Sequence, residues 1–171
     1  MSDGATLSVT AFGAVATYRI NGSAENDSNL NIVGGNGADP LLGGRRDDII
    51  EGGGGDDLLV GGRGADGLLG EAGADTFAYR SMRETKQSAA DVIFDLESGD
   101  TIDLSAIDAN TTVDGNQAFA LVEAFTGAGG EATLSGDDAY GYLLMDTDGD
   151  ARVEGRMTML GDVTGFEGWV W

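Results

Sequence analysis

Large apolar residues recur every nine positions through the middle of the chain, and an Asp stands two positions before each of them. The apolar residues are Leu41, Ile50, Leu59, Leu68 and Phe77. The acidic residues are Asp39, Asp48, Asp57, Asp66 and Asp75. Both series keep their register through five consecutive units, from residue 34 to residue 78. A flexible linker would not hold two such series in register, whereas a repeating coil requires it.

Each unit has the same internal order. A Gly-rich stretch ends in the Asp and a mostly apolar triplet follows, as in GGGGDDLLV. Because Gly tolerates positive φ, the first part predicts a tight turn, and the triplet predicts a short strand with one inward-facing residue. Eighteen residues then form one flattened coil with a narrow aliphatic core between two parallel sheets. Successive units alternate sides, which stacks Asp39, Asp57 and Asp75 along one edge and Asp48 and Asp66 along the other.

The segment before the repeats alternates apolar and polar positions and is rich in β-branched residues, a pattern typical of strands. We expect two strands, at residues 7–10 and 15–20, around Gly13. They would cap the N-terminal end of the roll, because a bare end exposes unpaired strands. Residues 22–33 resemble degenerate coils with Ile32 facing inward.

After the repeats, residues 81–87 predict a short polar turn with helical character. The alternation of Val92, Phe94 and Leu96, and later Ile102, predicts strands that continue the stack. The last third predicts antiparallel strands separated by loops of Gly, Asp and Thr. These strands are expected at residues 118–125, 132–134, 140–145, 153–160 and 169–171.

The expected fold is all-β. It is a parallel β-roll of GGxGxDxUx coils, where U is a large apolar residue, capped by short strands at the N-terminus and an antiparallel β segment at the C-terminus. We divide the chain into three parts: N-terminal cap strands and a degenerate repeat at 1–33, the roll at 34–80, and a C-terminal β cap at 81–171.

The amino-acid composition of the chain excludes several classes of function. The 171 residues include 30 Asp or Glu and 9 Lys or Arg, giving a net charge of −21, with no Cys and no His. So acidic a chain repels nucleic acid and anionic lipid, and no apolar run approaches the roughly 20 residues of a membrane span. The absence of His and Cys excludes imidazole bases, thiol nucleophiles and the usual zinc sites. We therefore expect cationic ligands and no enzymatic activity.

Calcium is the cation that fits. Stacked carboxylates at sheet spacing repel one another, and bare Gly turns leave carbonyl oxygens accessible, so consecutive turns offer the oxygen ligands that calcium prefers. Pairing turns one coil apart gives three candidate sites, at Asp39 with Asp57, Asp48 with Asp66, and Asp57 with Asp75. The full set of candidate ligands is Gly35, Asn36, Gly37, Asp39, Gly44, Asp48, Gly53, Gly55, Asp57, Gly62, Gly64, Asp66, Gly73 and Asp75.

Two units depart from the pattern. Arg46 replaces the fourth-position Gly of the second unit, and Glu71 replaces the second-position Gly of the last. We expect fewer than three ideal sites, with the Asp48–Asp66 pair weakened most, because the Arg46 side chain can take the place of a cation or force a different turn.

Two acidic groups outside the repeats leave alternatives open. Asp91, Asp95, Asp100 and Asp103 form either a further calcium site or turn caps and solvated loop carboxylates. The loop at 146–154 resembles an EF-hand loop, but the match fails because the sixth and twelfth positions of that motif hold Ala and Met. That loop is either a polar hairpin turn or a weak cation site.

The nonapeptide GGxGxDxUx resembles the repeat of the RTX calcium-binding β-rolls. With the segments GADTFAYRS, DVIFDLESGDTIDLSAIDAN and DTDGDARVE that follow it, the stretch from residue 34 to about 165 is similar to the C-terminal region of serralysin-type metalloproteases and to R-modules of mannuronan C-5-epimerases. The resemblance implies a module that binds calcium outside the cell, folds upon it and carries an uncleaved C-terminal signal for a type I exporter. The final EGWVW fits such a signal loosely and equally fits a last strand that packs two Trp.

Three functions follow as hypotheses. The first is a calcium-dependent folding and secretion module, free-standing or attached to a parent or partner secreted enzyme; the N-terminus lacks the features of a cleavable signal peptide. The second is an accessory module that binds a polysaccharide such as alginate, for which Arg45, Arg46 and Arg63 are the one basic cluster. The third is a surface or adhesive element in which calcium links molecules.

Overall fold

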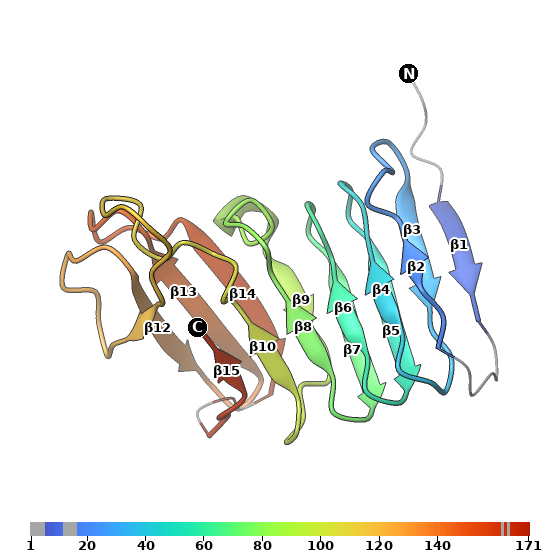
Figure 1. The fold of residues 1–171 in the computed structure, drawn as a ribbon. Helices are drawn as coiled ribbons and strands as arrows, with labels where there is room; N and C mark the ends of the chain where they lie inside the picture. Colours follow the sequence, from blue (N-terminus) through green and yellow to red (C-terminus); the bar gives the residue numbers. More distant parts are fainter. Residues whose placement is uncertain (1–5, 12–16, 162, 164) are drawn as a thin grey trace.

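Two β-sheets face each other along an elongated roll (Figure 1). The computed structural model of the protein describes residues 6–11, 17–161, 163 and 165–171. Sheet A contains, in spatial order, β1 (Thr6–Thr10), β3 (Asn29–Val33), β5 (Ile49–Gly54), β7 (Gly67–Ala72), β9 (Asp91–Ile93), β14 (Gly155–Leu160), β13 (Tyr140–Asp146), β12 (Glu131–Gly136) and β11 (Ala120–Leu121). Sheet B contains β15 (Trp169–Val170), β10 (Thr101–Asp103), β8 (Thr76–Ala78), β6 (Leu58–Val60), β4 (Pro40–Leu42) and β2 (Ile20–Asn21).

The chain passes from one sheet to the other at every turn, and the predicted eighteen-residue coil is confirmed. In sheet A, Ile50 lies beside Ile32 on one side and Leu68 on the other. In sheet B, Leu59 lies between Leu41 and Phe77. Each coil therefore adds one parallel strand to each sheet, at the usual spacing of about 4.8 Å.

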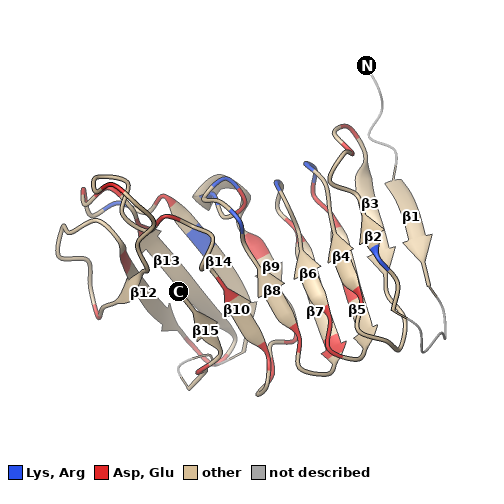
Figure 2. Cartoon of the chain, in the orientation of Figure 1, with Lys and Arg blue, Asp and Glu red and all other residues tan. Residues whose placement is uncertain are grey.

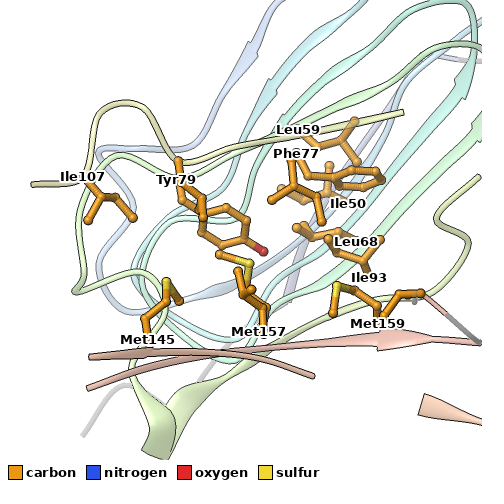
Figure 3. Packing of buried hydrophobic residues seen from close by; sticks show 14 of the residues in the cluster. Ile50, Leu59, Leu68, Phe77, Tyr79, Ile93, Ile107, Met145, Met157 and Met159 are labelled. Atoms are coloured by element: carbon orange, nitrogen blue, oxygen red, sulfur yellow. The ribbon is translucent and has the colours of Figure 1, made fainter. Parts of the chain in front are cut away.

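The core is a narrow row of inward-facing side chains between the two sheets, with one residue from each sheet in every coil. Ile50, Leu59 and Phe77 are fully buried, and Leu68 is 1% exposed. Figure 3 shows how this row meets the C-terminal segment, where Met145 and other side chains of β13 and β14 pack beneath the last coils. The core cluster extends without interruption from Leu30 to Val163. This continuity anchors the turns on both edges of the roll.

The C-terminal cap differs in part from the prediction. Strands β12, β13 and β14 are antiparallel as expected. However, β11 runs parallel to β12, and β15 crosses to sheet B and runs parallel to β10. The backbone N–H of Ile102 donates to the carbonyl of Gly168, and that of Leu104 donates to Val170, each at 2.7 Å. Alternation marks a strand but does not encode its direction, which depends on the sheet edge that the strand completes.

The predicted N-terminal strands form part of an additional coil. β1 matches the strand expected at 7–10 and pairs with β3. Of the strand expected at 15–20, residues 15 and 16 lie outside the described residues, and in the remainder only Ile20 belongs to a strand, β2, which pairs with β4.

The segment between β8 and β9 also needs correction. It contains a 3-10 turn, η1 (Gln87–Ala89), later than the helical turn expected at 81–87. Beyond it, Ile93 faces the core with no exposure, whereas Phe94 is 45% exposed. The inward face of β9 is therefore set by its pairing with β7 rather than by the alternation of Val92, Phe94 and Leu96. Across the described ranges, no helix is long and apolar enough to cross a membrane.

Candidate functional site

The five repeat Asp residues are buried in the turns, and each binds the backbone of the preceding coil. On the edge where the chain passes from sheet A to sheet B, Asp57 Oδ1 accepts from the N–H of Asp39 at 2.8 Å, and Asp75 Oδ1 accepts from Asp57 at 2.8 Å. On the opposite edge Asp66 Oδ1 accepts from Asp48 at 2.8 Å. The structure thus stacks the residues along the two edges as the sequence predicted.

The two stacks extend beyond the repeats. Asp91 Oδ1 accepts from the N–H of Asp66 at 2.9 Å, and Asp100 Oδ1 accepts from Asp75 at 3.0 Å. Asp95 receives the N–H groups of residues 70 and 71. Asp103, in contrast, binds Ser105 within its own turn. The four carboxylates therefore do not behave as one group. Three of them bind the backbone of the preceding coil, and Asp103 is a turn cap.

Sequence reasoning did not assign Asp91 and Asp100 to the stacks because each follows its neighbour by 25 residues instead of 18. A usable signal was present. Asp91 stands two positions before the buried Ile93, and Asp100 stands two positions before the buried Ile102, as in the repeats. The Asp-x-apolar half of the unit persists where the glycines are lost.

The carboxylates retain free ligand atoms. The Oδ2 atoms of Asp57, Asp66, Asp75 and Asp91 are buried and have no hydrogen-bond partner among the described residues. A Cβ atom at the first Gly of the third, fourth or fifth unit would collide with the Oδ2 atom of the Asp in the same unit. The turns are thus shaped around oxygen atoms that a cation can satisfy, which fits the chemistry of calcium.

Without a cation, these carboxylates are in an unfavourable environment. Burial raises the pKa of Asp57 to about 6, and the charges of Asp75 and Asp39 add to the rise. Burial likewise raises the pKa of Asp66 to about 7 and that of Asp91 to about 9, with the Asp48 charge adding to the first and the Asp66 charge to the second. A divalent ion reverses this situation by compensating the negative charge.

The turns fall into two conformational groups. In the third and fourth units the second and fourth positions are Gly with φ between 100° and 132°, and in the fifth unit Gly73 has φ 154°. The equivalent residues of the first two units, among them Gly35 and Arg46, are not in this region. The turns of the Asp57–Asp75 pair therefore share one conformation, whereas those of the Asp48–Asp66 pair differ. The first unit has Gly at both positions and shows the same departure, so the difference does not come from Arg46 alone, and the weakening of the Asp48–Asp66 site stays a prediction.

Glu71 occupies a position that favours Gly. Its φ is 65°, which costs an L residue about 1–2 kcal/mol. We expect Glu71→Gly to stabilise the folded chain by about 0.5–1 kcal/mol, because relief of this strain exceeds the added entropy of the unfolded chain. Chemical denaturation in calcium measures the change. Ala72→Gly in the same exposed turn, where φ is not positive, is the control and should destabilise. Destabilisation of similar size by both substitutions would contradict the strain.

Charge divides the two edges sharply. The turns at 34–39, 52–57, 70–75 and 95–100 contain eight acidic residues and no basic residue, and we call them the acidic edge. The turns at 43–48, 61–66 and 79–91 contain six basic and five acidic residues, and we call them the arginine edge. The net negative charge of the turns is therefore concentrated on the acidic edge, whereas buried carboxylate oxygens without a partner lie on both edges.

A separate acidic group lies in the hairpin between β13 and β14. Carboxylate oxygens of Asp146, Asp148, Asp150 and Glu154 lie within 4.8 Å of one another. Asp146 is buried, and both its oxygens accept backbone N–H groups of the loop, from Gly149 at 2.7 Å and residue 151 at 2.9 Å. This bonding is typical of a polar hairpin turn, and the cluster is of a composition that can hold a metal ion.

Comparison with known proteins identifies the family. A family model described as Peptidase M10 serralysin C terminal matches residues 6–167. The chain belongs to the serralysin C-terminal family. A search of curated proteins finds no match.

Two solved structures are similar to this member of the serralysin C-terminal family. The solution structure of the AlgE6R3 subunit from the Azotobacter vinelandii mannuronan C5-epimerase gives a TM-score of 0.57 at 26% identity, covering 83% of this chain and 77% of that one. The AlgE6R2 subunit of the same enzyme gives 0.48 at 22% identity, covering 94% and 87%. Family and fold together make this chain a calcium-binding structural β-roll.

Proposed function

We propose that the chain folds upon calcium outside the cell and that the loaded roll stabilises a secreted protein, with no catalysis of its own. The observation that carries this proposal is the set of buried, unpartnered Oδ2 atoms in successive turns. An orphaned buried carboxylate oxygen is costly, and a metal ion removes that cost.

The ligand set follows from the stacks. We propose that the carboxylates and accessible glycine carbonyls of paired turns hold the ions, with the fourteen candidate ligands named from the sequence as the starting set. The Asp57–Asp75 pair is the best formed, since its turns share a conformation and lie on the acidic edge. Asp91 and Asp100 extend the set by one coil on each edge.

Folding on calcium explains the charge. The net charge of −21 and the buried carboxylates destabilise the compact state when no cation is present, because like charges repel one another. Calcium that binds the folded chain and not the unfolded one drives folding by mass action. We propose that the chain passes through a type I exporter unfolded and folds outside.

In the folded chain the C-terminal tail is held in place by β15, which pairs with β10, and by the Trp169–Trp171 ring stack, whose ring centroids are 5.3 Å apart.

A calcium titration followed by far-ultraviolet circular dichroism tests the proposal, with magnesium as the control. We expect a cooperative gain of β signal with calcium alone. Asp57→Asn should raise the calcium midpoint several-fold more than Asp39→Asn, because Asp57 serves two paired turns. Substitution of Asp39 should affect calcium binding less, because both its carboxylate oxygens already accept backbone N–H groups, from Tyr18 and Gly35. Equal midpoints for the two variants, or a chain fully folded in chelator, would contradict the scheme.

A second role as an accessory module is favoured by the likeness to a subunit of a mannuronan C5-epimerase. In this role the module would contact the polymer on which its parent enzyme acts. The three Arg residues of the basic cluster noted in the sequence all lie on the arginine edge.

A further inference from the structure

The acidic edge and the arginine edge lie on opposite sides of the roll, because one set of turns leads from sheet A to sheet B and the other leads back. Six of the nine basic residues lie on the arginine edge, and all six are exposed. Figure 2 shows them at the tips of successive turns along one side of the roll. They are Arg45, Arg46, Arg63, Arg80, Arg83 and Lys86. The sequence alone revealed only the first three as a cluster, because the others are supplied by the long connection between β8 and β9.

The acidic edge divides its carboxylates between the interior and the surface. Four of its eight acidic residues are the buried Asp residues of the stack, which the proposed function assigns to calcium. Of the other four, Asp56, Glu71 and Glu97 are exposed. They stand in three successive turns of this edge, between β5 and β6, β7 and β8, and β9 and β10. Calcium in the buried stack therefore leaves a row of surface carboxylates, one in each of three coils.

The exposed charges of the two edges have no ion-pair partner within the molecule. Across the described residues one ion pair is present, between Arg152 and Asp150 at 3.6 Å, and it lies in the hairpin between β13 and β14. Glu84, the acid of the long connection, is half-buried and accepts the backbone N–H of Arg80 at 2.8 Å. Two opposed rows of unpaired charge indicate an electrostatic contact with another molecule.

The two edges also differ in relief. On the arginine edge, a hollow of about 160 Å³ includes Arg45 and Arg63 in its lining. A neighbouring hollow of about 450 Å³ includes Arg63 and Lys86. On the acidic edge, by contrast, all four residues at 71–74 are exposed, so the middle turn projects from the roll. A projecting acidic turn and a hollow lined by cations are complementary in both shape and charge.

We propose that the arginine edge of one molecule docks against the acidic edge of a second copy of this chain. Turns repeat once per coil on both edges, at about 4.8 Å, so a sideways translation of the roll places the three basic turns beside the three turns with exposed carboxylates. Guanidinium groups bind carboxylates through charge-assisted hydrogen bonds. A single surface ion pair contributes little, whereas pairs repeated along both edges act as a network.

The contact joins two different surfaces, and a sideways translation does not close on itself. Each added molecule therefore presents one free edge of each sign, and the assembly grows into a row of parallel rolls. The inference rests on the proposed function, because the turns form only in the folded roll. Calcium is not the link between molecules, since the ions are assigned to the buried carboxylates and the contact to the exposed ones.

Sedimentation of the calcium-loaded chain over a range of concentrations measures the assembly. In about 0.1 M salt the Debye length is about 10 Å, so the net charges of two copies are screened beyond the contact while facing side chains still attract. The weight-average mass should rise with concentration above the 17.5 kDa of the monomer and should not level off at a dimer. In about 1 M salt, where the Debye length is about 3 Å, the mass should return to that of the monomer.

An exchange of charges between the edges identifies the surfaces that meet. Arg63→Glu with Arg83→Glu reverses charges on the arginine edge, and Glu71→Lys with Glu97→Lys reverses charges on the acidic edge. Each double variant alone should remain monomeric, because it lacks one of the two edges. An equimolar mixture should associate, because the intact acidic edge of the first variant meets the intact arginine edge of the second.

A matched control separates the edges from the total charge. Arg19→Glu with Arg152→Glu makes the same change of net charge as the arginine-edge variant, at exposed sites off both edges. Its association constant should lie within about twofold of that of the unchanged chain.

Glu71→Gly gives a second, independent readout. It removes the central carboxylate of the acidic edge from a position whose φ of 65° favours Gly, so association should weaken several-fold while the folded chain becomes more stable. Ala72→Gly in the same turn keeps the charge and should leave association unchanged. Association of Glu71→Gly as strong as that of the unchanged chain would contradict the role of this carboxylate.

Four results would overturn the inference: a folded chain that stays monomeric in about 0.1 M salt, assembly that stops at a dimer, assembly that survives about 1 M salt, or equal losses in the arginine-edge variant and its control. Circular dichroism of each sample in calcium separates the two proposals. A chain that folds on calcium but stays monomeric contradicts this inference alone, whereas a chain that stays unfolded in calcium contradicts both.

Discussion

In calcium-free buffer, the folded fraction of the chain, measured by far-ultraviolet circular dichroism, is expected to be highest at pH 5 and to fall as the pH rises to 8. Asp57, Asp66 and Asp91 have pKa values raised from 3.8 to about 6, 7 and 9, so the folded chain takes up protons that the unfolded chain releases. Their contribution is least unfavourable near pH 4 and becomes steadily worse as the pH rises through each raised pKa. The expected loss is on the order of 5 kcal/mol, with the partly exposed Asp57 contributing least.

Saturating calcium should reverse the slope. The ion binds the deprotonated carboxylates, so protons compete with it and stability should increase from pH 5 to pH 8. Circular dichroism at four pH values without calcium measures the first slope, thermal melts at the same pH values in calcium measure the second, and magnesium in place of calcium is the control. At pH 8 the chain should be unfolded without calcium and should melt cooperatively with it. Parallel slopes with and without calcium would show that the buried carboxylates are not the ligands.

Phe77→Ala is expected to destabilise the calcium-loaded chain by about 3–5 kcal/mol. Phe77 is fully buried in the row of inward side chains, beside Leu59 of one neighbouring coil (Figure 3). On its other side it pairs with Ile102 of the next coil. The narrow core has one such residue per sheet in each coil, so no neighbour can fill the cavity. Because total stability is typically 5–15 kcal/mol, the variant should lose a large part of it. Denaturant unfolding in saturating calcium measures the loss.

Phe94→Ala is the matched control for this substitution. Phe94 is 45% exposed and lies on the outer face of sheet A, where it covers Gly67. Its removal takes the same atoms from the chain but leaves no enclosed cavity, so the cost should be about 1 kcal/mol or less. Similar losses from the two variants would contradict the assignment of Phe77, rather than Phe94, to the core row.

The repeats were predictable from sequence because their structure is decided within nine residues. The inward residue, the turn glycines and the Asp stand at fixed offsets within each unit, so the places of Leu59 and Asp57 follow from the repeat itself. The eighteen-residue register and the stacking along two edges follow from that local rule. The same reasoning predicted calcium as the ligand, because stacked carboxylates beside accessible carbonyl oxygens provide the oxygen ligands that calcium prefers.

The rest depended on contacts between segments far apart in sequence. The pairing of β9 with β7 sets Ile93 inward and brings Asp91 beneath Asp66, 25 residues away. The edge of β10 decides that the tail runs parallel in sheet B, a direction that an alternating pattern does not contain.

The sequence by itself determined the coil, its period, the buried row and the stacked acidic residues, because each is fixed by short-range spacing. Only the tertiary structure decided which carboxylates beyond the repeats join the stacks, how the C-terminal strands close the roll, and that six cations share one edge. The physical reason is that a turn's side in the roll depends on how many times the chain has crossed between the sheets. Long connections such as 79–91 change the spacing along the sequence while preserving that count.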